Sequence, residues 1–252
     1  MMKNFTYYFK EIFARIWAIW GLVTFLITFL IIFIPSMLTY LIKGNKGQAA
    51  FIFISKIWMR CWLFLIGCSL KVKGLENFEK DKTYIITFNH NTLLDVPITC
   101  PFIPGANKTI AKSSFTKIPL FGSFYRKGAV LVNRKSDKSR RESYIEMKRV
   151  LAQNIYMCIY PEGTRNRSKE LLKPFYDGAF KLSVETETAI MPALLFNTNK
   201  AQPNNKFLYL LPTKLEMHFL QPVFPESKTA KELKDIVFNT MLTYYSENIN
   251  KV

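Results

Sequence analysis

A stretch without any charged residue, from Ile16 to Ile42, most constrains how this chain can fold. As a helix that rises about 1.5 Å per residue, the stretch would reach roughly 40 Å, which exceeds the roughly 30 Å hydrocarbon core of a bilayer. A secretory signal would have a far shorter apolar region, followed by small residues at a cleavage site. Pro35 allows a kink, so a tilted membrane span and a helix that enters the membrane and returns are both compatible with the sequence.

A second apolar stretch, from Ala49 to Leu70, carries two charges, Lys56 and Arg60. Their spacing places both on one face of a helix, and such a helix lies on a membrane surface better than it crosses the bilayer. The alternative for both stretches is a pair of buried core helices.

Positive charges flank the first stretch on both sides. Lys43 and Lys46 follow it and favour a cytoplasmic position for the rest of the chain. Lys3, Lys10 and Arg15 precede it and weaken this inference. We expect a membrane location, at the cytoplasmic face of the inner (cell) membrane.

The formal net charge of +17 and the pI near 9.7 indicate an anionic surface or ligand, because excess positive charge repels itself and is attracted most strongly by phosphate. Nucleic acid, anionic lipid and a phosphorylated substrate all meet this condition. The chain is 49% hydrophobic and contains 22 Phe, whereas disordered basic tails are poor in aromatic residues. Composition therefore favours lipid, and we expect no nucleic-acid partner.

The 252 residues suffice for one α/β domain and an attached segment of about sixty residues. We place membrane-associated helices in residues 1–72 and the α/β domain in residues 73–252. The cysteines show no C-x-x-C pair or framework spacing, and a chain of this size needs no disulfide. We expect them to be reduced, on the cytosolic side and mostly in the core: Cys61, Cys68, Cys100 and Cys158.

Beyond Gly74, short apolar runs alternate with polar helical stretches. The runs predict strands at 83–88, 129–132, 155–160 and 189–196, and a half-exposed strand at 214–220. Helices are predicted at 137–153 and 177–187; Ser139 with Glu142, and Thr229 with Glu232 at the start of a final helix, have the spacing of capping boxes. This alternation predicts a single α/β domain whose central, mostly parallel sheet is flanked by helices, preceded by the two-helix membrane segment. Ligand groups should lie on loops at strand ends.

His90 follows the first of these strands directly, and Asp95 comes five residues later. An imidazole in a strand-end loop can point one nitrogen at a substrate while the other donates to a carboxylate, which fixes the tautomer and stabilises the imidazolium. No G-x-S-x-G turn supplies a protein nucleophile. Such a pair is suited to deprotonating a substrate hydroxyl that attacks an acyl group directly. The other histidine, His218, is expected to be structural or exposed, and two separated histidines without a cysteine cluster predict no zinc site.

Several cations follow other strands. Arg165 ends the block YPEGTR, in which Gly163 lets the backbone turn closely and the guanidinium offers a planar fork for phosphate. Arg134 follows the strand at 129–132, and Lys112 follows the run Thr109–Ala111. Cations at successive strand ends beside a His-Asp pair indicate an acid/base site that faces a phosphate.

These blocks occur in a recognisable order. NH-x4-D, a strand ending in Arg, YPEGTR and a strand containing Ile190-Met191-Pro192 together resemble the four-block pattern of the glycerolipid acyltransferase superfamily, which bacterial 1-acylglycerol-3-phosphate acyltransferases typify. The resemblance covers about residues 83–195. It implies that His90 is the general base and Asp95 its partner, and that the acceptor site includes Arg134, Glu162, Gly163, Thr164, Arg165 and a phosphate-site lysine, Lys112.

The resemblance also implies a reaction. A fatty acyl group would pass from acyl-carrier protein or acyl-CoA to the hydroxyl of 1-acylglycerol-3-phosphate (lysophosphatidic acid), forming phosphatidic acid without a metal or organic cofactor. Asn133, Tyr160 and Asn166 depart from the family pattern and leave other acceptors open, such as a lyso-ornithine lipid or lysophosphatidylethanolamine. A non-catalytic membrane protein that binds anionic lipid is a further alternative, although phosphate binding alone would not require the pair His90–Asp95.

Overall fold

The computed structural model describes residues 2–252, with side chains from Tyr7 onward, so the Lys3 side chain lies outside the described residues. Its strands are β1 (Ser69–Lys73), β2 (Ile85–Phe88), β3 (Asn107–Lys112), β4 (Ala129–Val132), β5 (Tyr156–Ile159), β6 (Ile190–Phe196) and β7 (Lys214–Phe219). Its α-helices are α1 (Met2–Leu38), α2 (Gly44–Leu65), α3 (Asp95–Thr99), α4 (Phe121–Gly128), α5 (Asp137–Ala152), α6 (Gly178–Thr186), α7 (Thr198–Ala201) and α8 (Ala230–Asn248). Short 3-10 turns are η1 (Thr39–Leu41), η2 (Leu75–Asn77), η3 (Cys100–Phe102) and η4 (Ser113–Lys117).

The strands form a seven-stranded sheet in the order β1-β7-β6-β2-β5-β3-β4. All strand pairings in the described chain are parallel except that between β6 and β7, which is antiparallel. The mostly parallel α/β fold is therefore confirmed. The strands β2, β5, β3 and β4 point the same way, so their C-terminal ends meet at one edge of the sheet. Ligands bind at this edge in open α/β sheets, and we call it the site edge.

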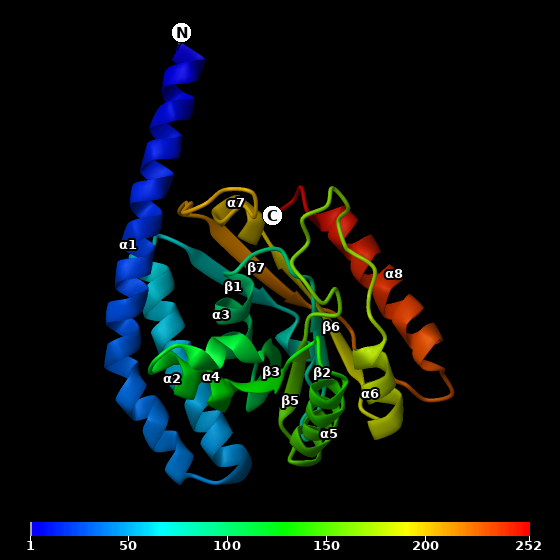
Figure 1. Cartoon of the computed structure of the whole chain (residues 1–252). Coiled ribbons are helices and arrows are strands. Elements are labelled where there is room, and N and C mark those ends of the chain that lie inside the picture. Colours follow the sequence, from blue (N-terminus) through cyan, green and yellow to red (C-terminus); the bar gives the residue numbers. More distant parts are fainter. Residues whose placement is uncertain (1) are drawn as a thin grey trace.

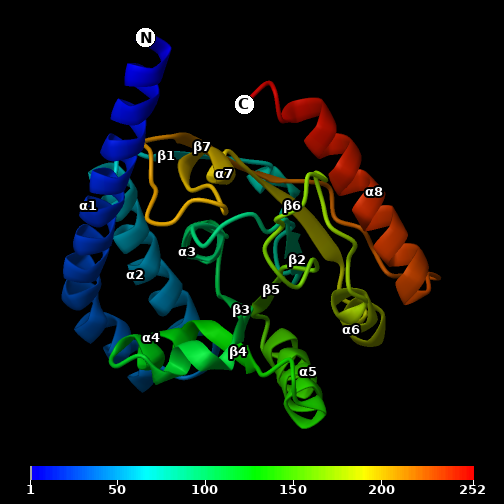
Figure 2. The ribbon, with the colours of Figure 1, turned by 45° about the horizontal axis from the view of Figure 1, so that its top comes forward.

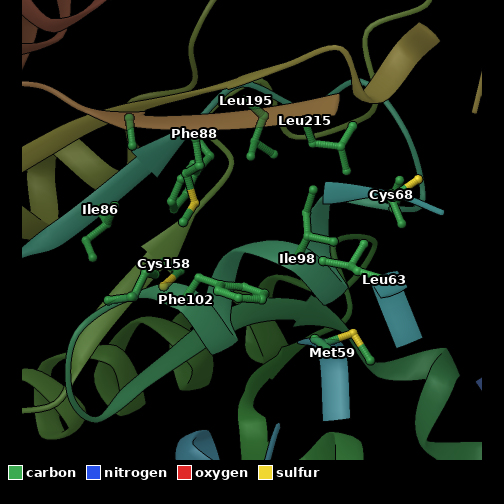
Figure 3. Packing of buried hydrophobic residues seen from close by; sticks show 14 of the residues in the cluster. Met59, Leu63, Cys68, Ile86, Phe88, Ile98, Phe102, Cys158, Leu195 and Leu215 are labelled. Atoms are coloured by element: carbon green, nitrogen blue, oxygen red, sulfur yellow. The ribbon is translucent and has the colours of Figure 1, made fainter. Parts of the chain in front are cut away.

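Helices cover both faces of the sheet (Figures 1 and 2). The helices α1 to α4 lie on one side and α5, α6 and α8 on the other. Successive residues of a strand point to opposite faces, so a strand covered on both faces is apolar throughout. In β2, for example, Ile85 joins the core beneath α8, whereas Ile86 and Phe88 join the core beneath α2. Figure 3 shows the second of these cores, where Met59 and Leu63 of α2 pack toward the strands.

The helices α1 and α2 form an antiparallel hairpin that is joined by tryptophans. The chain contains four Trp, and the indole N–H of each donates across the two helices. Trp17 and Trp20 bind the carbonyls of Ile66 and Leu65, Trp58 binds Thr28 Oγ1, and Trp62 binds Gly21 O, all at 2.9 Å. A hydrogen-bonded indole needs a fixed partner, so these bonds set the register of the hairpin.

The two helices differ in how much they bury. Both are long and apolar enough to cross a membrane. In the most apolar 18-residue stretch of each helix, 17% of α1 and 44% of α2 is buried. The alternative of a buried core helix is therefore wrong for α1, which presents an apolar outer face, and holds in part for α2. The α2 helix also ends at Leu65, and the chain continues into β1, which the sequence did not predict.

The other elements largely follow the predictions, with two corrections. The Thr229 capping box is confirmed, but helix α5 is capped by Ser136, whose Oγ accepts from the N–H of Ser139, and not by Ser139 itself. The strand at 214–220 was expected to be half-exposed, yet His218 is buried between Tyr244 and Glu216, because α8 covers this face of β7. His218 is structural, and burial lowers its pKa.

Candidate active site

The loop after β2 is fixed to the sheet by Asn89. Its side-chain amide donates to Leu195 O at 3.0 Å and accepts from Leu195 N at 2.7 Å. The Asn89 side chain thus extends the hydrogen bonding between β2 and β6 beyond the end of β2. Asn89 is fully buried, so its amide requires both bonds. The next residue, His90, therefore leaves the sheet from a fixed point at the site edge.

Asp95 and His90 are brought together by the turn between them. Asp95 opens α3 and is fully buried. Its Oδ2 lies 2.8 Å from His90 Nδ1 and accepts from the backbone N–H groups of Asn91 at 2.6 Å and Thr92 at 2.7 Å. Its Oδ1 accepts from Thr92 Oγ1 at 3.1 Å. The expected turn is thus present, and the His90 imidazole, 17% exposed, keeps an open side toward solvent.

Glu162 joins this loop to the loop after β5. One of its carboxylate oxygens accepts from the His90 backbone N–H at 2.7 Å, and the other accepts from the Lys173 N–H at 3.1 Å. Burial raises the pKa of Glu162, and the two backbone bonds oppose this shift. Both oxygens face backbone, so the structure directs Glu162 toward the His90 loop and away from the exposed cations.

Tyr160 lies under the imidazole. Its ring centroid is 4.5 Å from that of His90, and its hydroxyl forms a 2.8 Å hydrogen bond with Thr99 Oγ1 at the end of α3. Burial raises its pKa well above the usual value, and the neighbouring Asp95 adds to this rise. The Tyr160 hydroxyl thus ties the end of β5 to α3, the helix that carries Asp95.

The turn at Gly163 requires glycine for two reasons. Its φ is +71°, a left-handed conformation that side chains disfavour. A Cβ atom here would also lie 2.6 Å from Cε2 of Tyr176 and 3.8 Å from an Arg134 guanidinium nitrogen. Arg134 comes from β4 and β3 lies between β4 and β5, so its side chain reaches across one strand to the Gly163 turn.

The remaining predicted residues lie at neighbouring strand ends. Lys112 ends β3 in register with Val132 of β4 and is exposed. Thr164 accepts from the Lys173 ammonium at 2.7 Å through its hydroxyl. Arg165 is half-buried, and among residues 7–252 no carboxylate pairs with the side chain of Lys112, Arg134 or Arg165. The site edge therefore combines a buried carboxylate–imidazole pair with cations that remain available to an anionic ligand.

Sequence reasoning missed the loop that follows α7. Asn204 donates from one amide nitrogen to the carbonyls of Asn91 and Asn166, and Gln202 Oε1 accepts from the Leu94 N–H at 3.1 Å. This polar segment reads as an ordinary surface loop. Only the folded chain shows that it contacts both loops of the site.

Comparison with known proteins gives concordant results. A family model described as Acyltransferase matches residues 69–195, half of the chain. The chain is 33% identical over 142 residues to the 1-acyl-sn-glycerol-3-phosphate acyltransferase of Borreliella burgdorferi, covering 54% of this chain and 55% of that protein. It is 26% identical over 189 residues to 1-acyl-sn-glycerol-3-phosphate acyltransferase alpha of Mus musculus, covering 73% of this chain and 66% of that protein. The chain thus spans between about half and two thirds of these relatives.

A solved structure is similar over almost the whole chain. It is the crystal structure of the 1-acyl-sn-glycerophosphate (LPA) acyltransferase PlsC from Thermotoga maritima, with a TM-score of 0.79, 21% sequence identity, and coverage of 94% of this chain and 97% of that one. At this identity the similarity concerns the fold. It includes the N-terminal hairpin, because so little of either chain is left unmatched.

Proposed function

Because the chain belongs to the acyltransferase family, we propose that it transfers a fatty acyl group from acyl-carrier protein or acyl-CoA to the free hydroxyl of 1-acylglycerol-3-phosphate, forming phosphatidic acid. The observation that carries this proposal is the buried Asp95 carboxylate 2.8 Å from His90 Nδ1, at the sheet edge that also presents Arg134 and Arg165. Both relatives are named as acyltransferases for this acceptor, which supports the proposal.

In the proposed mechanism His90 is the general base. Since Nδ1 faces Asp95, Nε2 is the nitrogen that receives the proton of the acceptor hydroxyl. The oxygen attacks the thioester carbonyl carbon, the C–S bond breaks, and the departing thiolate takes the proton from the imidazolium. Asp95 stabilises the imidazolium while it exists. General-base assistance of this kind is typically worth about 10²–10⁴-fold in rate.

The acceptor phosphate would bind to the cations at the site edge. Arg165 offers a bidentate fork, Arg134 reaches the same turn from β4, and Lys112 lies at the end of the strand between them. Gly163 allows this close approach. Glu162 has both oxygens occupied by backbone donors, so we assign it to holding His90 in place and not to the phosphate.

The hairpin would place the site at a membrane. The outer face of α1 exposes apolar side chains such as Ile19, Leu26, Ile27, Leu30 and Ile34, an extent that soluble monomers avoid. Because α1 and α2 also pack on the domain, we propose that the hairpin enters one side of a bilayer by this face and holds the site edge near the lipid headgroups. The cytoplasmic side of the cell membrane is where acyl-CoA and acyl-carrier protein are available.

The test is acyl transfer by purified protein in detergent or vesicles. Lysophosphatidic acid, a lyso-ornithine lipid and lysophosphatidylethanolamine are supplied in turn with acyl-CoA or acyl-carrier protein, and the lipid products are identified. We expect phosphatidic acid from the first acceptor and its loss in His90→Ala. Product from another acceptor only would replace the assigned substrate. Tight lipid binding without any transfer would favour the non-catalytic alternative.

A further inference from the structure

Asn204 occupies a distinctive position between the two loops of the site. Its amide nitrogen donates to the carbonyl of Asn91, the residue after His90, and at 2.9 Å to the carbonyl of Asn166, the residue after Arg165. Asn204 lies outside residues 69–195, the segment that the family model matches. A single carboxamide therefore links the residue next to the proposed base with the residue next to the proposed phosphate ligand.

We propose that Asn204 is a positioning residue for acyl transfer, which sets the separation between His90 and Arg165. This proposal rests on the function proposed above, in which one acceptor molecule must present its hydroxyl to His90 while Arg165 holds its phosphate. Two direct bonds already join the loops, from Asn166 N to His90 O at 2.6 Å and from His90 N to Glu162 at 2.7 Å. Asn204 adds a further connection between the loops, through the carbonyls of Asn91 and Asn166, which limits how far the loops can rotate about the two direct bonds.

The buried end of the same amide supports this role. The Asn204 Oδ1 atom is buried and has no hydrogen-bond partner among the described residues. An unsatisfied buried acceptor costs stability, and an aliphatic side chain would avoid that cost. The fold keeps the amide here, which is consistent with its two donated bonds being needed.

The loop that carries Asn204 is in turn held by α1. Lys206 forms an ion pair with Glu11, and the Leu210 N–H donates to Ala14 O at 3.1 Å. The Leu210 side chain also packs against Gly21, where a Cβ atom would lie 2.7 Å from it. The position of Asn204 is thus fixed by the membrane-facing helix, so the geometry of the site depends on α1, although none of the α1 side chains described, from Tyr7 onward, belongs to the site.

The experiment compares Asn204→Ala and the equally sized Asn204→Asp with Asn205→Ala, a matched control in an exposed neighbouring residue. Steady-state kinetics with lysophosphatidic acid and acyl-CoA should show kcat reduced about ten- to a hundred-fold in both Asn204 variants, since a displacement of about 1 Å can cost about 10²-fold. The acceptor KM should stay within about threefold, because Arg165 itself is intact. The control should match the unaltered protein.

Hydrogen exchange provides a readout that does not depend on activity. In the Asn204 variants, peptides covering 89–95 and 163–167 should exchange faster, while the α5 and α8 peptides stay unchanged. Unchanged kcat and exchange, an equal effect of Asn205→Ala, or faster exchange throughout the domain with kcat lost in proportion to folded protein would each overturn the proposal. If the site peptides loosen as expected but the unaltered protein does not acylate lysophosphatidic acid, the proposed function fails while the link between the loops stands.

Discussion

Asp95→Asn is the substitution that isolates the charge of the carboxylate most cleanly. The oxygen of an asparagine can occupy the place of Oδ2, where it still accepts from Asn91 N, Thr92 N and the imidazole. The new NH2 group then faces Thr92 Oγ1, which can accept a hydrogen bond as readily as donate one. Every contact therefore has a replacement, and only the negative charge beside His90 is removed.

The size of the effect follows from the 2.8 Å separation. Full unit charges at this distance attract each other by about 6 kcal/mol at an effective dielectric constant near 20, which is the upper limit for an imidazolium that forms only in the reaction. A lower limit of about 1.5 kcal/mol corresponds to one charge-assisted hydrogen bond. Since about 1.4 kcal/mol is a factor of ten in rate, kcat should fall by about 10–10⁴-fold.

The assay is single-turnover acyl transfer with saturating acceptor, together with thermal unfolding of the same protein sample. Because the contacts are replaced, the melting temperature of Asp95→Asn should lie within about 4 °C of the original, equivalent to roughly 1 kcal/mol for a chain of this size. Thr99→Ser is a matched control on the same helix that retains its hydroxyl. If Asp95→Asn keeps more than about a tenth of the rate while remaining folded, Asp95 does not act through its charge on His90, and the assignment of the pair is incorrect.

Three other perturbations test separate parts of the proposal. Arg165→Lys keeps the charge but loses the fork, so the acceptor KM should rise roughly ten- to a hundred-fold; an equal rise in the donor KM in the same kinetics would contradict phosphate binding. Glu162→Gln leaves one of two buried N–H groups without an acceptor and should lower the free energy of unfolding by about 1–3 kcal/mol at neutral pH. Because the pKa of Glu162 is raised in the folded protein, its carboxyl contributes stability below the unfolded pKa that is lost as pH rises. The difference in the free energy of unfolding between the original protein and Glu162→Gln, measured with denaturant, should therefore narrow from pH 4 to 7. Ile27→Glu together with Ile31→Glu should reduce vesicle binding in a sedimentation assay without lowering activity on detergent-dispersed acceptor, and unchanged binding would show that this face does not enter the membrane.

The positions that could be predicted from the sequence are those of residues whose partners are near in the chain or are fixed by the parallel sheet. His90 and Asp95 are five residues apart in one turn, so their spacing alone allowed the contact. Arg134, Lys112 and Arg165 follow strands that the apolar runs indicated, and parallel strands bring such ends to one edge.

The features that were missed depend on distant or competing contacts. Asn204 reaches Asn91 across 113 positions, and no local pattern distinguishes it from other loop amides. Helix α5 is capped by Ser136, whereas the hydroxyl of Ser139 accepts from the Asn133 N–H at 3.0 Å, a contact that the spacing of Ser139 and Glu142 does not reveal. Residues 214–220 alternate like a half-exposed strand, yet α8 covers the face of β7 on which His218 lies. The strand β1 continues an apolar stretch that reads as helix until Gly67 turns the chain with a φ of +66°.

The tryptophans of the hairpin give this protein a built-in optical probe. All four indoles lie in α1 and α2, so the intrinsic tryptophan fluorescence reports on the hairpin and on the part of the core that Trp58 and Trp62 enter. The tryptophans also differ in how far they are accessible from outside the protein, because Trp20 is 45% exposed whereas Trp58 is 4% and Trp62 is 7% exposed. Bromine-labelled acyl chains should therefore quench Trp20 strongly and Trp58 weakly, which would measure how far the hairpin enters a bilayer without attaching any label to the protein.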